Sequence, residues 1–390
     1  MEKAIACAFP VFALLMLAEA GIGLARGRCT YRVNDAIANL SQGILSQVTL
    51  VFTNVFHLGV YTLLFEHVVL LRTASFWDAW YGWVAALVLV DFCGYWAHRC
   101  SHKVAILWAA HVVHHQSQTF NFSTALRQES AYPLLGFLFY LPLALLGMPP
   151  AVFALAWLGV LLYQVWIHTE LVGRLGWFDR VFASPSNHRV HHALNEAYID
   201  RNFGGMLIIW DRLFGTFVAE GTEPCVYGTR PLLQSWDPIH ANLIVYRKLL
   251  HDARLARRWS DKLRVWLMPP GWRPADVAQR DPRPPFDMAA VRVFDPELGR
   301  GALVFAATQF LLLAGAAAAF LWFADQLSLG LAAPLVGGFA AALWIVGRVL
   351  HGELGVGRAL AADAILCALL LAALPFVLGN SSYWHPPFLT

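Results

Sequence analysis

Long apolar runs with almost no charge constrain this chain most, because such runs partition into a lipid bilayer. A hydrocarbon core about 30 Å thick is crossed by about 20 apolar residues in a helix. Hydrophobic residues make up 58% of the 390 positions and charged residues 14%, against about 25% charged in soluble domains. We therefore predict an all-α fold, a polytopic integral-membrane helical bundle. The apolar runs cover 4–25, 36–71, 76–97, 131–148, 151–170, 300–324, 329–350 and 358–379.

Three of these runs raise questions of their own. The run 4–25 ends near an A-x-A site (Ala18-Glu19-Ala20) but exceeds the usual core of a signal peptide, so we expect an uncleaved membrane helix. The run 36–71 is too long for one crossing, which predicts an interfacial helix followed by a span, or one kinked hairpin. The runs 131–148 and 151–170, joined by Met148-Pro149-Pro150, predict a helical hairpin.

Polar, Pro-rich sequence ends near residue 296, where hydrophobicity returns. This change predicts a membrane-embedded catalytic domain over 1–295 and C-terminal transmembrane helices over 296–390. Basic residues gather on one predicted face: Arg99, Lys103, the Arg-rich block 171–299 and Arg348. The positive-inside rule makes that face cytoplasmic. The preference for Arg over Lys suggests a bacterial source, and hence an inner-membrane protein.

Charge and cysteine content exclude several classes. A net charge of +3 is too small to indicate a nucleic-acid partner. The six cysteines are scattered and form no C-x-x-C pair, so neither a disulfide framework nor a thiolate zinc site is indicated. The chain shows no C-x-x-C-H haem motif, G-x-G-x-x-G fingerprint or iron–sulfur cysteine cluster. Electrons for a redox reaction would therefore come from a separate reductase, a ferredoxin or a diffusible reductant.

Histidines cluster in the middle of the chain. Residues three and four apart share one face of a helix, so each motif forms an imidazole pair or triplet. We expect all of them at the cytoplasmic ends of helices, where four helix ends can meet around one site. Nine of the fifteen histidines lie between 98 and 192, as H-x-x-x-H (His98, His102), H-x-x-H-H (His111, His114, His115), H-x-x-H-H (His188, His191, His192) and the single His168.

Neutral imidazole is a good ligand for iron, zinc and copper. Nine imidazoles are too many for one ion, so two ions are expected. Zinc hydrolases usually combine three ligands with a carboxylate base. Only Asp91, Glu129 and Glu170 are available near the motifs here. A site built almost wholly of histidine at a membrane surface favours iron and oxygen chemistry.

The histidine motifs resemble those of the fatty acid hydroxylase and sterol desaturase superfamily. Within it, the sequence is most similar to the alkylglycerol monooxygenases, over roughly 30–220. The three histidine motifs are specific for the superfamily, whereas the C-terminal spans match only in character. The stretches that carry the resemblance are 31–35 (YRVND), 121–128 (NFSTALRQ), 164–170 (QVWIHTE) and 202–217 (NFGGMLIIWDRLFGTF).

The resemblance implies a di-iron centre on a helical membrane fold, ligated by the nine histidines above. It also implies activation of O₂ and hydroxylation of a lipid C–H bond. In alkylglycerol monooxygenases, hydroxylation beside the ether oxygen yields a hemiacetal, which collapses to a fatty aldehyde and glycerol. The animal enzymes take electrons from tetrahydrobiopterin. Hydroxylation or desaturation of a sterol, a fatty acid or a carotenoid is the alternative within the superfamily.

Two positions depart from the family pattern. Lys103 follows the first motif, where the animal enzymes carry an acidic residue, which weakens the case for tetrahydrobiopterin. Asn187 stands where the family often has a further histidine, so we expect it beside the ligands rather than among them.

Four more polar residues are expected to support the histidines. Asp91 lies two helical turns before His98, on the same face, and is expected to accept a hydrogen bond from a ligand histidine. Glu170 is expected to do the same beside His168. Arg127 and Glu129 either orient ligands, bind a lipid headgroup or form an interfacial ion pair.

Two other classes of function remain open. A membrane haem electron carrier also places histidines in spans, but as facing axial pairs rather than dense clusters at helix ends. A metal transporter binds its ion near the bilayer midplane, whereas these histidines are predicted at one surface.

Overall fold

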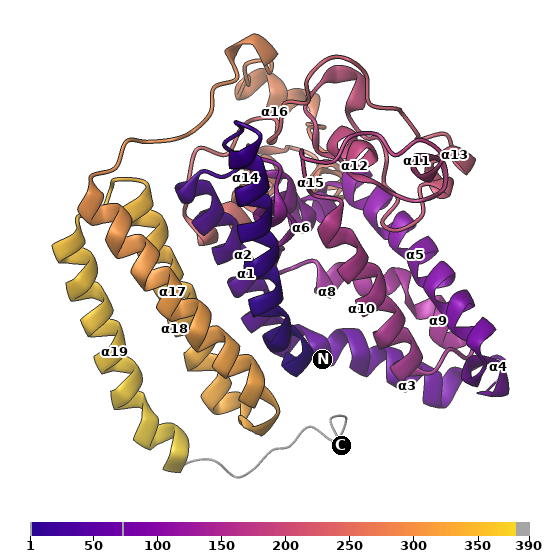
Figure 1. Cartoon of the computed structure of the whole chain (residues 1–390), viewed down its shortest axis with the longest axis horizontal. Helices are drawn as coiled ribbons and strands as arrows, with labels where there is room; N and C mark the ends of the chain where they lie inside the picture. The colour runs from indigo at the N-terminus through magenta and orange to yellow at the C-terminus, as the bar shows by residue number, and fades with distance from the viewer. Residues whose placement is uncertain (1, 72–73, 380–390) are drawn as a thin grey trace.

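The chain folds almost entirely into helices (Figure 1). The structure is a computed structural model and describes residues 2–71 and 74–379; the end of the predicted C-terminal unit, 380–390, lies outside them. Its only extended pairings in the described residues are the isolated bridges Phe182–Leu207 and Ala193–Tyr227. The α-helices are α1 (Glu2–Ala25), α2 (Val33–Asn54), α3 (Val60–Val68), α4 (Ala74–Asp78), α5 (Trp80–Lys103), α6 (Ala105–His115), α7 (Phe122–Ala125), α8 (Pro133–Gly136), α9 (Leu141–Leu145), α10 (Pro150–Trp166), α11 (Phe178–Val181), α12 (Pro185–His192), α13 (Ile209–Leu213), α14 (Pro238–Leu255), α15 (Trp259–Leu267), α16 (Ala275–Arg280), α17 (Arg300–Phe323), α18 (Leu329–Leu350) and α19 (Val356–Gly379).

Four segments of the described chain are long and apolar enough to cross a membrane: Ile5–Ala25, Val33–Val68, Arg300–Gln326 and Leu329–Leu350. The predicted integral-membrane, all-helical class is thereby confirmed. Helix α5 is also long enough, but it carries Asp91 and several Trp and Tyr residues and is not among the four. It runs beyond the predicted end at 97 and includes the whole first histidine motif.

Two predicted segments take a different form. The run 36–71 is neither a hairpin nor an interfacial helix followed by a span. Helix α2 descends first, and a π-helical segment, Val55–Gly59, turns the chain into α3, which lies across the lower end of the bundle (Figure 1). A π-helical turn is a common cause of such a kink.

The expected single span at 131–148 is also wrong. This stretch breaks into α8, a 3₁₀ turn at Phe137–Phe139 and α9. Pro133 and Pro142 each start a short helix, and proline cannot continue a helix that precedes it. Only the second arm of the predicted hairpin forms a continuous helix, α10.

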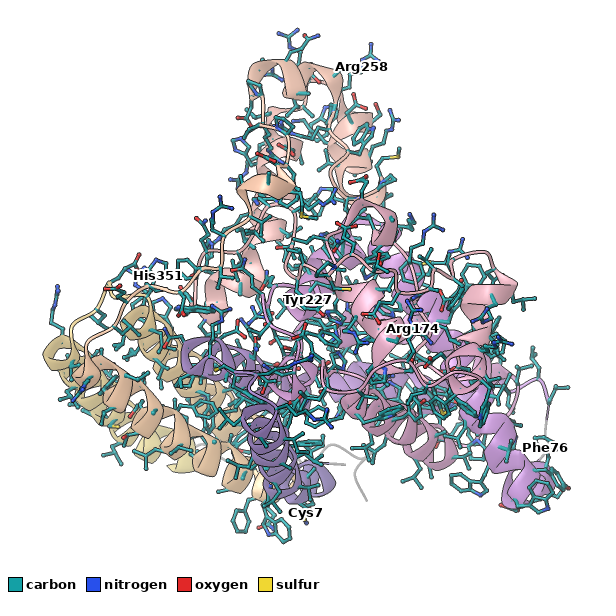
Figure 2. All side chains as sticks on the ribbon, turned by 45° about the horizontal axis from the view of Figure 1, so that its top comes forward. Cys7, Phe76, Arg174, Tyr227, Arg258 and His351 are labelled. Atoms are coloured by element: carbon teal, nitrogen blue, oxygen red, sulfur yellow. The ribbon has the colours of Figure 1, made fainter. Side chains whose placement is uncertain are left out.

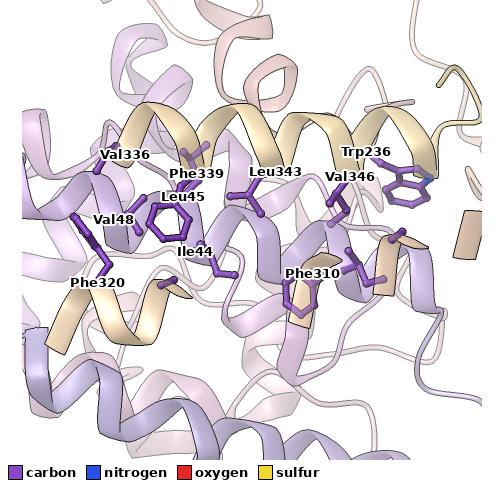
Figure 3. Packing of buried hydrophobic residues seen from close by; sticks show 14 of the residues in the cluster. Ile44, Leu45, Val48, Trp236, Phe310, Phe320, Val336, Phe339, Leu343 and Val346 are labelled. Atoms are coloured by element: carbon purple, nitrogen blue, oxygen red, sulfur yellow. The ribbon is translucent and has the colours of Figure 1, made fainter. Parts of the chain in front are cut away.

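The N-terminal and C-terminal membrane helices share one apolar core. Ile44, Leu45 and Val48 of α2 pack against α17 and α18 (Figure 3). Trp236, from the Arg-rich block 171–299, also belongs to this cluster. The division into 1–295 and 296–390 therefore stays a prediction, since α17 and α18 lie directly on α2.

The histidine-bearing segments lie at one end of the bundle. Figure 1 shows α6 and α12 near the upper ends of α5 and α10, while the N-terminus lies at the opposite end. Helix α5 contacts both α6 and α10, and α14 covers α6. This arrangement brings the ends of α5 and α10 to the two histidine helices α6 and α12.

Candidate metal centre

All nine predicted histidines come together, and they divide into two groups. Within each group one ring nitrogen from every histidine lies within 4.8 Å of the others. We call these sets the five-histidine group and the four-histidine group. The first contains His98, His102, His111, His115 and His191, and the second contains His114, His168, His188 and His192.

This division differs from the expected triplets, because each H-x-x-H-H motif serves both groups. His111 and His115, four apart on α6, stay together, while His114 joins the other group. Helix α12 is divided in the same way, with His191 separated from its neighbours. Residues four apart differ by about 40° around a helix and adjacent residues by about 100°, so adjacent histidines point to different sites.

The Nε2 atoms converge inside each group. In the five-histidine group, Nε2 of His115 lies 3.3 Å from that of His111 and 3.2 Å from that of His191. In the four-histidine group, His168 lies 3.2 Å from His114 and 3.0 Å from His188 by the same atoms. Two ligand nitrogens about 2.1 Å from one ion, at right angles, would lie about 3 Å apart. The spacing fits shared coordination of one cation in each group.

The opposite ring nitrogens are held by the protein. Nδ1 of His98 lies 2.8 Å from the carbonyl oxygen of Phe203, and Nδ1 of His191 lies 2.9 Å from that of Arg201. Nδ1 of His168 lies 2.8 Å from the carbonyl oxygen of Gln164. A carbonyl only accepts, so these nitrogens carry the proton and Nε2 keeps its lone pair. Each such imidazole presents a ligand atom to the centre of its group.

Burial favours the neutral, ligating form. Burial lowers the pKa of His111 to about 3 and that of His114 to about 4. The Nε2 atoms of His98 and His102 are buried with no hydrogen-bond partner in the described part of the chain. Such atoms are costly unless something satisfies them, and a bound cation would do so. The residues present therefore fit a metal.

Two carboxylates approach the five-histidine group. Glu129 is buried and accepts from Nδ1 of His111 at 3.0 Å. Burial raises the pKa of Glu129 to about 7. Asp200 lies 3.6 Å from Nδ1 of His102 and also pairs with Lys103. Glu129 thus hydrogen-bonds a predicted ligand histidine, and this contact and its burial favour the first of the predicted alternatives over the lipid-headgroup and interfacial ones.

The loop that follows α12 positions two carbonyl groups through residues with an unusual backbone conformation. Asp200 and Asn202 adopt positive φ angles of 58° and 55°. Among non-glycine residues, Asp and Asn tolerate this conformation best. The carbonyls of Arg201 and Phe203 are the ones that fix His191 and His98.

Arg127 is a buried residue that supports the four-histidine group. Its carbonyl oxygen lies 3.0 Å from Nδ1 of His114. Its buried guanidinium donates to the carbonyl of Val113 at 2.6 Å, to Gln116 at 2.9 Å and to Asn39 of α2 at 3.0 Å. Arg127 therefore orients a ligand candidate rather than binding a headgroup or pairing with Glu129.

Helix α2 supplies the counter-charge for Arg127. Asn39 donates to Asp35 at 2.9 Å, and Ser117 donates to the same carboxylate at 3.0 Å. Both Asp35 and Asn39 are buried. A buried charge is tolerated only when it is well hydrogen-bonded, so this network joins α2 firmly to the end of α6. Sequence reasoning missed it, although two polar residues four apart in an apolar run were a usable signal.

The other three predicted supports do not touch the histidines. Asp91 accepts from the backbone of Met206 and Leu207 and from the indole of Trp210. It thereby fixes the loop that includes Phe203, whose carbonyl contacts His98. Asp91 thus acts on a histidine through this loop and not through the predicted direct hydrogen bond. An acceptor buried on a helix satisfies the nearest unpaired backbone donors first.

Glu170 lies away from the histidines, and Asn187 stands outside both histidine groups. Glu170 is exposed and accepts from the hydroxyl of Tyr227 at 3.0 Å. The ring of Tyr227 stacks on Phe120, which stacks on His168, so two rings separate Glu170 from the group. Asn187 donates to the carbonyls of Asp179 and Phe182, and its side chain belongs to neither histidine group.

A comparison with protein families bears on what this centre does. Residues 83–216 match the model of the fatty acid hydroxylase family, and this segment contains all nine histidines. Residues 83–216 therefore resemble a fatty acid hydroxylase domain. The resemblance seen in the sequence is thereby confirmed, and the family fits the iron-dependent chemistry expected of histidine-rich sites.

Curated relatives extend the match beyond the family segment. Alkylglycerol monooxygenase from Homo sapiens is 38% identical over 268 residues, covering 68% of this chain and 59% of the relative. The Danio rerio protein of that name is 39% identical over the same shares. An ornithine lipid hydroxylase from Rhizobium tropici is 34% identical, covering 37% of this chain and 45% of the relative. The chain thus spans about three-fifths of the length of the alkylglycerol monooxygenases. No solved structure matches it.

Proposed function

We propose that this protein is an integral-membrane di-iron monooxygenase that hydroxylates a lipid C–H bond. The observation that carries the proposal is the division of nine histidines into two groups with converging Nε2 atoms. One ion in each group accounts for all nine. The number of groups supports two irons, and the family supports iron over zinc.

In this proposal, the five-histidine group and the four-histidine group each hold one iron through Nε2. Iron bound there would activate O₂, with two electrons and two protons from outside the centre, so that one oxygen atom enters a lipid C–H bond and the other leaves as water. The protein contributes fixed imidazole orientations, because carbonyls and carboxylates hold the opposite ring nitrogens. It also contributes a dry surrounding, since eight of the nine histidines are buried.

Alkylglycerols are the first substrate class to test, because the relatives that match most of this chain are alkylglycerol monooxygenases. The alternative is hydroxylation or desaturation of another lipid, such as a sterol, fatty acid or carotenoid. The ornithine lipid hydroxylase favours a polar membrane lipid within that alternative. Electrons come from tetrahydrobiopterin or from a separate donor protein. Positive charge at the histidine end favours a cytoplasmic active site in a bacterial inner membrane.

The test is lipid turnover by purified protein under O₂. Detergent-purified protein, loaded with iron, is incubated with an alkylglycerol and either tetrahydrobiopterin or a reductase–ferredoxin pair. Mass spectrometry then follows the fatty aldehyde and any hydroxylated lipid. The proposal expects O₂-dependent product with wild type and none with His114→Ala/His191→Ala, which removes one histidine from each group. Equal product from both proteins, or no product from a panel of ether, ornithine, sterol and fatty acyl lipids, would refute it.

A further inference from the structure

Helix α15 carries an exposed apolar strip outside the metal centre. Trp259, Leu263 and Leu267 are 81%, 68% and 65% exposed. They are spaced four residues apart, so they line one side of the helix. Exposed apolar side chains are ordinary when they are scattered, but three in a row on one helix face mark a surface that contacts something.

The opposite side of α15 is firmly packed. Val265 is buried against Ala105 and Ala109 of α6 and against α14. The backbone amide of Ala105 donates to the carbonyl of Met268 at 3.0 Å, which fixes the end of α15 at the start of α6. The strip therefore points away from the protein in a defined direction and is not a loosely attached helix face.

Positive charge surrounds the strip. Residues 254–264 contain five basic and one acidic side chain, a net charge of +4, whereas the whole chain carries +3. Arg254, Arg257 and Arg258 are all exposed. Lys262 and Arg264 lie about 60° to either side of the strip. Lys262 donates to carbonyls at the end of α14, and Arg264 pairs with Asp261.

The position of α15 brings this surface to the level of the membrane boundary. Figure 1 labels α15 at the height of the upper ends of α5 and α10, and its helix neighbours are α14 and α6. In Figure 2, the arm that carries Arg258 extends to the top of the view, away from the C-terminal membrane helices at lower left. An arm at this height that extends beyond the membrane helices would lie over lipid.

We propose that α15 lies in the headgroup region of a bilayer containing anionic phospholipids. Trp259, Leu263 and Leu267 insert below the headgroups, and the surrounding arginines contact phosphate. Tryptophan with aliphatic residues on one face, flanked by basic residues, is the composition of interfacial helices. An acidic soluble partner would match the charge, but it would not call for an aliphatic strip of this length. The inference rests on membrane embedding and not on the proposed metal chemistry.

Binding of α15 to lipid would also affect the histidine helix α6. Because α15 packs directly on the first turns of α6, a lipid-bound α15 would hold the histidine helix at a fixed depth beside the membrane. A lipid substrate could then reach the centre without leaving the bilayer.

Site-specific fluorescence quenching tests the proposal on the full chain. In a background with the exposed Cys7, Cys29 and Cys367 changed to Ser, a bimane label is attached at Leu263→Cys or at Gln279→Cys. Gln279 is an exposed residue of α16, on the same arm but off the strip. The protein is placed in nanodiscs of phosphatidylcholine and phosphatidylglycerol. Doxyl-labelled lipid quenches labels within the bilayer, and iodide quenches labels in water. The background without a new cysteine measures residual labelling.

We expect doxyl lipid to reduce emission from Leu263→Cys about twofold, as for a side chain about 5–10 Å below the surface, with little effect on Gln279→Cys. Iodide should show the reverse order. Iodide quenching of Leu263→Cys as strong as that of Gln279→Cys would place the helix in water and overturn the proposal. Protection from both quenchers would also overturn it, in favour of a covering protein. Equal doxyl quenching without phosphatidylglycerol would overturn the role of anionic lipid.

Discussion

The two histidine groups differ in what holds their outer nitrogens. The five-histidine group has two carboxylates behind it, Glu129 at His111 and Asp200 near His102. The four-histidine group is held by backbone carbonyls, for example that of Arg127 at His114. Aromatic neighbours differ as well: the ring of Trp108 lies 4.9 Å from that of His102, while Phe120 stacks on His168 at 5.4 Å.

A carboxylate makes the imidazole that it contacts a stronger donor to a metal than a carbonyl does. The five-histidine group should therefore bind its ion more tightly, and the four-histidine group should lose its ion first. The comparison teaches that the two halves of one centre share one kind of support and differ in a second. Backbone carbonyls hold imidazoles in both groups, whereas carboxylates contact only the five-histidine group and the network from α2 reaches only the four-histidine group.

Removing one ligand candidate from each group has the largest expected effect. His191→Ala should weaken the five-histidine group, and His192→Ala the four-histidine group. Each should lower lipid turnover by about 100-fold or more, since loss of a ligand exceeds the loss of its supporting partner. Turnover per chain, measured with saturating reductant, checks this. His67→Gln, at an exposed position, is the control. Activity within twofold of wild type in either variant would remove that histidine from the centre.

The buried network of α2 should matter next. Asn39→Leu breaks the bonds to Arg127 and Asp35 and should lower the free energy of unfolding by about 3 kcal/mol, as expected when buried charges lose a partner. Thermal unfolding in detergent measures this loss. Asn34→Leu on the same helix, whose partner is an exposed carboxylate, should cost less than about 1 kcal/mol. Equal losses of unfolding free energy in the two variants would show that the buried network contributes no more to stability than the exposed hydrogen bond of Asn34.

Glu129→Gln sharpens the comparison between the groups. The amide keeps the shape but removes the charge behind His111, so iron affinity at the five-histidine group should fall about tenfold. The four-histidine group should be unaffected. Competition with a chelator, followed by two-phase iron release, measures both. Glu170→Gln, whose partner is Tyr227, should change neither phase. A matching fall in the four-histidine phase would contradict the assignment.

The smallest effect is expected at Lys103. It pairs with Asp200 at 2.5 Å in a half-exposed position, and such pairs contribute less than about 1 kcal/mol. Lys103→Ala should therefore leave thermal stability nearly unchanged and alter iron release from the five-histidine group by less than about fivefold, the factor that corresponds to about 1 kcal/mol. Scanning calorimetry and the chelator assay check both. A fall as large as that from Glu129→Gln would give Lys103 a larger part in the centre.

The membrane class and the nine clustered histidines were predictable from sequence because both are local patterns. Apolar runs identify helices such as α1, α17 and α18, and spacing of three to four residues identifies His98 with His102. The family was recognised from the same motifs. Spacing within one helix could not show how the helices would divide their histidines, since that depends on where α6 and α12 face each other.

Most of the groups that hydrogen-bond to the histidines could not be predicted from the sequence. The carbonyls of Phe203 and Arg201 carry no signal, because every residue has one. Asp91 was expected to meet a histidine, and it meets backbone amides from a loop more than 110 residues away. The break at 131–148 is an exception, since Pro133 and Pro142 mark it in the sequence despite the high hydropathy of this run.

Metal content measures the central claim most directly. Full-length wild type, His111→Ala and His188→Ala would be purified in detergent, loaded anaerobically with ferrous iron and freed of excess. Inductively coupled plasma mass spectrometry then gives iron per chain. The account predicts about two irons in wild type and about one in each variant, since each variant damages one histidine group. One iron or none in fully folded, reconstituted wild type would contradict a di-iron centre.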